Sequence, residues 1–156
     1  MPASFNLFEA GLDDSHDILA WRNHPDTRKN SVNTHAIDER EHELWFKQRL
    51  ASELCKIYMA RDENGLNLGM VRFDIHADAQ MAEISIAIAP ASQGQGLAAL
   101  LLRRAIETFD RTELILQARV KDENIPSKKS FERNGFTILD DTSPFLTYQK
   151  VQKKQH

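Results

Sequence analysis

The stretch that decides the fold is a glycine-containing loop, Gln93-Gly94-Gln95-Gly96-Leu97-Ala98. It follows an alternating apolar pattern over 82–89, which predicts a strand that Pro90 ends, and it opens a Leu- and Ala-rich helix predicted over 97–109. The glycines let the main chain approach a ligand closely, and the free N–H groups of a first helical turn attract an anion. The loop therefore indicates either a cradle for a pyrophosphate or a turn that only begins a helix.

Two other phosphate-binding loops do not fit this stretch. The Gly-Lys-Ser/Thr ending of a P-loop does not follow Gly96. A Gly-x-Gly-x-x-Gly dinucleotide loop needs a crossover to a parallel strand. The strands predicted over 55–61, 66–76 and 82–89 instead follow one another as antiparallel hairpins, the first turning at Asn64-Gly65.

The remaining elements complete an α+β pattern on both sides of the loop. Strands are predicted over 4–9, 114–120, 136–139 and 145–151. Helices are predicted over 13–23, capped by Asp14 or Ser15 and ended by Pro25, from an Asp38 cap to Leu50, and over 126–133. This order predicts one domain over 1–156, with a mixed, mainly antiparallel sheet and helices on both faces.

Length and composition place the chain among globular proteins. Its 156 residues fit one domain, and 41% hydrophobic with 28% charged residues argues against disorder. A net charge of -3 gives no support for binding to nucleic acids or anionic membranes. The longest apolar run, 97–102, is too short to span a membrane, no signal peptide is expected over 1–14, and the single Cys55 favours a reducing compartment. We therefore expect a cytoplasmic protein, monomeric or homodimeric.

Metal chemistry is not expected from this sequence. It holds neither a His-Glu-x-x-His motif nor a cysteine cluster. A Glu-x-x-His spacing at 39–42 stands alone, whereas a di-iron bundle needs two such pairs.

A second segment decides how the glycine loop is interpreted. It reads Asn124-Ile125-Pro126-Ser127-Lys128-Lys129-Ser130-Phe131-Glu132-Arg133-Asn134-Gly135-Phe136. With the loop, it resembles the GNAT superfamily of acyl-CoA-dependent N-acyltransferases. The family's Gln/Arg-x-x-Gly-x-Gly/Ala pattern is matched by Gln93, Gly96 and Ala98. Its Asn, small residue, aromatic-Glu pair and Gly-Phe are matched by Asn124, Ser127, Phe131-Glu132 and Gly135-Phe136.

The resemblance implies an acyl-CoA N-acyltransferase fold with acetyl-CoA as cosubstrate, held in a notch between the fourth and fifth strands. Main-chain groups from Ile86 to Ile88 would meet the pantetheine, and Asn124 would lie near the thiol. The acetyl group would pass directly to an amine. The residues expected to bind the cofactor are Ile86, Ile88, Gln93, Gly94, Gln95, Gly96, Leu97, Ala98, Asn124, Ser130 and Phe131.

Phe131 is a departure from the family pattern. Many members carry a tyrosine there, as the acid that protonates the leaving thiolate, and Phe131 has no hydroxyl. The tyrosines of this chain, Tyr58 and Tyr148, do not match that position. Ser130, Ser85 or a water could serve, or the thiolate leaves unaided, because the pKa of a thiol is only about 8.5.

The general base follows from strand alternation. If Ile84, Ile86 and Ile88 face the same way as the apolar residues of 71–75, then Glu83, Ser85, Arg72 and Asp74 share the opposite face. A carboxylate there could deprotonate an ammonium group, directly or through water. The resemblance agrees, since several family members use a Glu on this strand. We therefore predict Glu83 as base and Ser85 as a participant, the alternative being a solvated polar face.

The acceptor is expected to bind near the helices that precede the first hairpin. Trp21-Arg22-Asn23 with the downstream 42–46 segment resembles the branch of ribosomal-protein N-terminal and polyamine acetyltransferases. It resembles most the nucleotide-amino-sugar N-acetyltransferases of the pseudaminic and legionaminic acid pathways. The predicted substrate-binding residues are Arg22, Asn23, Trp45 and Arg72, the alternatives being core tryptophans and a surface arginine.

The preferred acceptor is a nucleotide-linked amino sugar. Arginines and lysines at 22, 28, 29 and 72 suit an anionic diphosphate, whereas a polyamine pocket should be rich in Asp and Glu. A protein N-terminus or a polyamine remains an alternative acceptor. A non-catalytic acyl-CoA-binding module is an alternative of another class, which the replacement at Phe131 keeps open.

Overall fold

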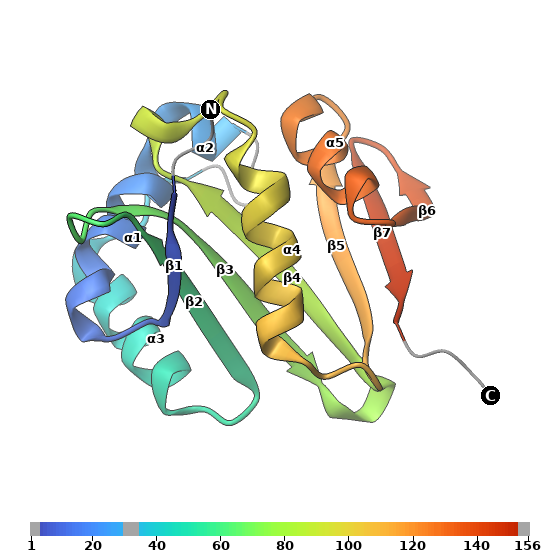
Figure 1. Cartoon of the computed structure of the whole chain (residues 1–156), viewed down its shortest axis with the longest axis horizontal. Coiled ribbons are helices and arrows are strands. Elements are labelled where there is room, and N and C mark those ends of the chain that lie inside the picture. The colour runs from blue at the N-terminus through green and yellow to red at the C-terminus, as the bar shows by residue number, and fades with distance from the viewer. Residues whose placement is uncertain (1–3, 30–34, 153–156) are drawn as a thin grey trace.

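A single seven-stranded sheet organises the chain (Figure 1). The computed structural model describes residues 4–29 and 35–152. In the order β1-β2-β3-β4-β5-β7-β6, every neighbouring pair is antiparallel except β4 and β5. The predicted mixed, mainly antiparallel sheet is thus confirmed. The strands are β1 Asn6–Glu9, β2 Cys55–Arg61, β3 Asn67–His76, β4 Met81–Ile88, β5 Ile115–Lys121, β6 Thr137–Thr142 and β7 Phe145–Val151.

Helices cover both faces of this sheet, as predicted (Figure 1). The helices are α1 Ser15–Asn23, α2 Pro25–Lys29, α3 Glu39–Ala51, α4 Leu97–Phe109 and α5 Ile125–Arg133. On one face, Trp21 of α1 and Phe46 of α3 pack with Met59 of the sheet. On the other, Phe109 of α4 stacks on Phe73 of β3, with ring centres 4.1 Å apart. Among the described residues, none of the helices has the length and apolar character needed to cross a bilayer.

Local signals place most element ends, with two corrections near α1. The Asp38 cap of α3 is confirmed, since its carboxylate accepts a hydrogen bond from Glu41 N at 3.3 Å. Asp14 precedes α1 but does not cap it, because its carboxylate accepts from Gly11 N at 2.8 Å and pairs with Arg61 at 2.7 Å. Pro25 ends α1 as predicted, yet it also begins the unpredicted helix α2, because proline suits a first helical turn.

The pairing of β4 creates a split in the sheet. Its antiparallel register with β3 places Val71 opposite Ile86 and Arg72 opposite Ser85, which confirms the predicted faces. Its parallel pairing with β5 stops after the Glu83–Gln117 pair. Beyond it, the β4 edge from Ile84 to Ile88 has no β5 partner. The predicted notch between the fourth and fifth strands therefore exists, and it opens toward the N-termini of α4 and α5 (Figure 1).

Candidate active site

Two cavities meet at this split. We call one the loop cavity; it measures about 480 Å³ and lies between the unpaired end of β4, the glycine loop and the start of α5. We call the other the arginine cavity; it measures about 580 Å³ and lies between α1, α3 and strands β3 to β5. A ligand could extend from one to the other, because both are lined by Thr27, Ile86, Ala87, Asn124 and Ser127.

The loop cavity has the features of an anion cradle. Gly94 and Gly96 adopt the left-handed conformation, with φ of 79° and 73°. Gly96 precedes α4 without any side-chain cap, so the first N–H groups of this helix stay available to a ligand. Gln93 Nε2 donates a hydrogen bond to Ile88 O at 3.2 Å, which ties the loop to the end of β4.

Most of the predicted cofactor residues surround this cavity. Those that line it are Ile86, Ile88, Gln93, Gly94, Gly96, Leu97, Ala98, Asn124 and Ser130. Gln95 is exposed and does not line it, and Phe131 lines the adjoining arginine cavity instead.

The first turn of α5 fixes two polar groups beside the split. Asn124 caps the helix, since its Oδ1 accepts a hydrogen bond from Ser127 N at 3.3 Å. This bond leaves the Asn124 Nδ2 group to donate toward a ligand. Ser130 Oγ donates to Pro126 O at 2.9 Å, so its proton is already used inside the helix.

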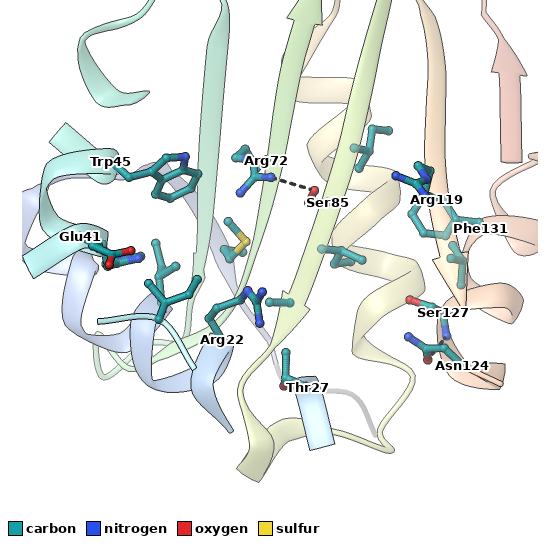
Figure 2. A pocket seen from close by; sticks show the side chains of 18 residues that line it. Arg22, Thr27, Glu41, Trp45, Arg72, Ser85, Arg119, Asn124, Ser127 and Phe131 are labelled. Carbon is teal, nitrogen blue, oxygen red and sulfur yellow. Dashed lines mark hydrogen bonds between the residues drawn. The ribbon is translucent and has the colours of Figure 1, made fainter. Parts of the chain in front are cut away.

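The arginine cavity gathers side chains from seven helices and strands, and Figure 2 labels several of these side chains. Arg72 is its best-fixed member. Its Nε donates to Asp74 Oδ2 at 2.8 Å, its Nη2 donates to Ser85 Oγ at 3.2 Å, and its guanidinium lies 5.0 Å from the centre of the Trp45 ring. Asp74 is also paired with Arg49 at 3.3 Å. Arg72 is therefore held in place before any ligand binds.

The charge in this cavity is mainly positive. Arg22, Arg72 and Arg119 line it, and the carboxylate that lines it comes from Glu41. The pKa of Arg22 lies below its usual value, because burial and then the charges of Arg28 and Arg72 oppose its protonation. Such a cavity favours an anionic ligand and disfavours a polycation.

His42 adds a neutral ring to the same cavity. It is 3% exposed and stacks on Phe46, with ring centres 5.7 Å apart. Burial lowers the pKa of His42, although a hydrogen bond to the Ser15 main chain and the charge of Glu43 oppose the shift. The ring is therefore uncharged at neutral pH, and its Nε2 has no hydrogen-bond partner within the described part of the chain.

Two predicted site residues lie away from the cavities. Glu83 lines neither one; its carboxylate is 39% exposed and lies 3.8 Å from His76 Nε2. Asn23 also lines neither one, because its side chain donates to Ile37 O at 2.8 Å and accepts from Ile37 N at 2.7 Å. Asn23 thus fastens the segment before α3 to α1. The predicted residues that do meet in the arginine cavity are Arg22, Trp45, Arg72, Ser85, Ile86, Asn124 and Phe131.

Several lining residues were not predicted from the sequence. They include Thr27, His42, Arg119 and Ser127. Ser127 stood in the quoted α5 motif but was assigned no role. The alternation of β5 could have placed Arg119 on the polar face of this strand, because its neighbours Ala118 and Val120 are buried on the opposite face.

The two tyrosines lie outside the linings of both cavities. Tyr148 is 1% exposed, and its hydroxyl donates to Glu132 Oε2 at 2.7 Å. Burial and this bond raise the pKa of Tyr148 to about 12. Tyr58 is buried against Phe73 in the core. Neither hydroxyl is therefore expected to reach the substrates, and within the described residues no three His, Cys, Asp or Glu side chains gather to hold a metal ion.

Comparisons with known proteins assign this arrangement to a family. The model of the Acetyltransferase (GNAT) domain matches residues 6–137. Acetyltransferase PseH of Campylobacter jejuni is 28% identical over 142 residues, covering 90% of this chain and 87% of that protein. Bacillus subtilis YwnH, provisionally named a phosphinothricin acetyltransferase, is 30% identical over 115 residues, covering 70% and 69%. Spermidine N-acetyltransferase from Vibrio cholerae, solved with CoA and spermine, has the same fold, with a TM-score of 0.81, 20% identity and 95% of each chain covered.

Proposed function

Since the chain belongs to the GNAT family and is an acetyl-CoA-dependent N-acetyltransferase, we propose that it acetylates a primary amine of an anionic small molecule. A nucleotide-linked amino sugar is the preferred acceptor. The observation that carries this proposal is the arginine cavity, which Arg22 and Arg72 line and in which Glu41 is the acidic residue among the described lining residues.

The two cavities divide the substrates between them. The loop cavity takes acetyl-CoA, with its pyrophosphate at the uncapped start of α4 and its pantetheine along the unpaired edge of β4. The thioester then lies at the shared wall, beside Ile86 and Asn124. The acceptor occupies the arginine cavity, so its amine approaches the thioester from the other side of that wall.

Charge favours an anionic acceptor over a polyamine. Spermine, which the Vibrio cholerae enzyme binds, is a polycation, whereas phosphinothricin carries an anionic phosphinate. Phosphate oxygens match the guanidinium groups of Arg22 and Arg72, and the flat face of Trp45 offers a surface for a ring. The resemblance of the 21–25 and 42–46 segments to amino-sugar enzymes points to the same class.

The polar face of β4 carries the proposed acid–base groups, Ser85 as a hydrogen-bond donor and Glu83 as the base. Ser85 accepts a hydrogen bond from Arg72, which leaves its own proton free to donate toward the substrates. Glu83 is two residues away on the same face and would act through an intervening water.

An acceptor panel tests the proposal. Release of CoA is measured with a nucleotide-linked amino sugar, the free amino sugar, phosphinothricin, spermidine and an N-terminal peptide. We expect the highest kcat/KM for the nucleotide-linked sugar and the lowest for spermidine. A preference for spermidine or the peptide would contradict the proposal.

A further inference from the structure

The leaving thiolate poses a chemical problem in this site. The amine nitrogen attacks the thioester carbonyl, the C–N bond forms, and the C–S bond breaks with its electron pair on sulfur. The nitrogen's proton passes to a base or to water, and a proton donor or a positive charge beside the sulfur would stabilise the thiolate as it leaves. Phe131 cannot donate a proton, the Ser130 hydroxyl donates to Pro126 O, and the Tyr148 hydroxyl donates to Glu132.

The position of the sulfur follows from the two cavities. The thioester must lie where acetyl-CoA in the loop cavity meets the acceptor in the arginine cavity. On the β5 side of the split, the side chains that line both cavities are Asn124 and Ser127. Figure 2 shows these two residues below Phe131 and Arg119, on the side of β4 away from Trp45. Arg119 is therefore the cation on this side of the cavity, whereas Arg72 lies on the other side with Asp74.

We propose that Arg119 holds the leaving thiolate and thereby replaces the missing hydroxyl at position 131. Its guanidinium lies 5.0 Å from the centre of the Phe145 ring, which orients it. None of the ion pairs between described residues uses Arg119, so its charge is not neutralised by a carboxylate. The inference rests on acetyl transfer at the split and is independent of the acceptor.

The thiol of bound CoA reports this contact directly. A neighbouring guanidinium lowers the pKa of a thiol below its usual value of about 8.5. Thiolate absorbance of the enzyme–CoA complex measures that pKa. The protein itself contributes little below about pH 10, because burial raises the pKa of Cys55 to about 11 and that of Tyr148 to about 12.

The variants compared are Arg119→Met, Arg119→Lys and the control Arg111→Met. Arg111 and Arg119 are both exposed, and Arg111 pairs with Glu113 outside both cavities. We expect R119M to raise the pKa of the CoA thiol by about one unit, a tenfold change in thiolate population, and R119K to raise it less. R111M should leave it unchanged. An equal thiol pKa in wild type and R119M would overturn the proposal, and this titration needs no acceptor.

Kinetics separate this role from binding of the acceptor. R119M should lower kcat about tenfold, with little change in KM for the acceptor or in the affinity for acetyl-CoA. Adding Phe131→Tyr to R119M should restore part of kcat, because the new hydroxyl can protonate the thiolate. A raised acceptor KM with unchanged kcat would show instead that Arg119 binds the acceptor, and would refute the assignment.

Discussion

Replacing Arg72 by methionine tests how the acceptor is recognised. The methionine keeps an apolar stem against Trp45 but loses the bonds to Asp74 and Ser85 and the contact proposed with a phosphate. A hydrogen bond to a charged group contributes about 1.5–3 kcal/mol. We therefore expect kcat/KM for the nucleotide-linked sugar to fall by about 10- to 150-fold. The value for a free amino sugar should fall only a few-fold.

The same substitution should lower stability moderately. The carboxylate of Asp74 is 14% exposed, so it needs a partner, but Arg49 still reaches it at 3.3 Å. We expect a loss of about 1–2 kcal/mol, well below the cost of stranding a fully buried charge. For a domain of this size that corresponds to a melting temperature lower by about 2–8 °C.

Arg49→Met is the matched control for this experiment. Arg49 shares Asp74 with Arg72 but does not line the arginine cavity. The assay is steady-state CoA release with charged and uncharged acceptors, together with thermal melting of each variant. R49M should lower stability without changing acceptor preference. Equal losses in R72M for charged and uncharged acceptors, or the same loss in R49M, would refute recognition of a phosphate by Arg72.

Three further substitutions probe other parts of the molecule. Gly96→Asp should abolish acetyl-CoA binding in calorimetry, because it puts a strained backbone and a negative charge at the anion cradle. The control Gly65→Asp is also strained, at φ 82°, but lies in a remote hairpin and should leave acetyl-CoA binding intact. Glu83→Gln should lower kcat/KM without changing acetyl-CoA affinity, and a wild-type pH profile would exclude Glu83 as base. Burial raises the pKa of Asp14, but bonds from Gly11, Arg61 and Asn67 outweigh it, so its pKa lies below the usual value. Its contribution to stability is thus present above about pH 4 and lost at lower pH, and Asp14→Asn should melt earlier at pH 7 but approach wild type in acid.

Strand alternation predicted the sheet well because its period is short and strict. The pairing of Phe73 with Ile84 and of Arg72 with Ser85 follows from putting apolar residues on one face. Helices cover both faces of the central strands. On one face, Met59 and Met70 pack against α1 and α3, and Arg72 lies on this same face where it lines the arginine cavity. Motif spacing likewise located the glycine loop and the start of α5.

Residues that depend on tertiary position were harder to predict. The side-chain amide of Asn23 is hydrogen-bonded to the main chain of Ile37, fourteen residues away, and no local sequence pattern predicts that contact. Arg119 lies on β5, which reaches the site only because the chain crosses over from β4 through α4. The alternation of β5 shows on which face of the strand Arg119 lies. Only the divergence of β4 and β5 shows that this face borders a cavity.

The same divergence separates the roles of Glu83 and Ser85, which alternation alone treats alike. Glu83 stands opposite Gln117 in the last pair that joins β4 to β5, whereas Ser85 lies beyond it and lines the arginine cavity. Two residues along a strand span about 6.6–6.8 Å, so the Glu83 carboxylate needs an intervening water to reach an amine beside Ser85. Loss of a general base costs about 10²–10⁴-fold in rate, and a base acting through water should lie at the lower end.

In E83Q we therefore expect kcat/KM to fall by about 10²-fold near neutral pH. The deficit should shrink as pH rises, because more of the acceptor then arrives as the free amine, whose conjugate acid has a pKa up to about 10.4. A deficit that stays constant with pH would mean that Glu83 acts on the shape of β4 and that the amine loses its proton elsewhere.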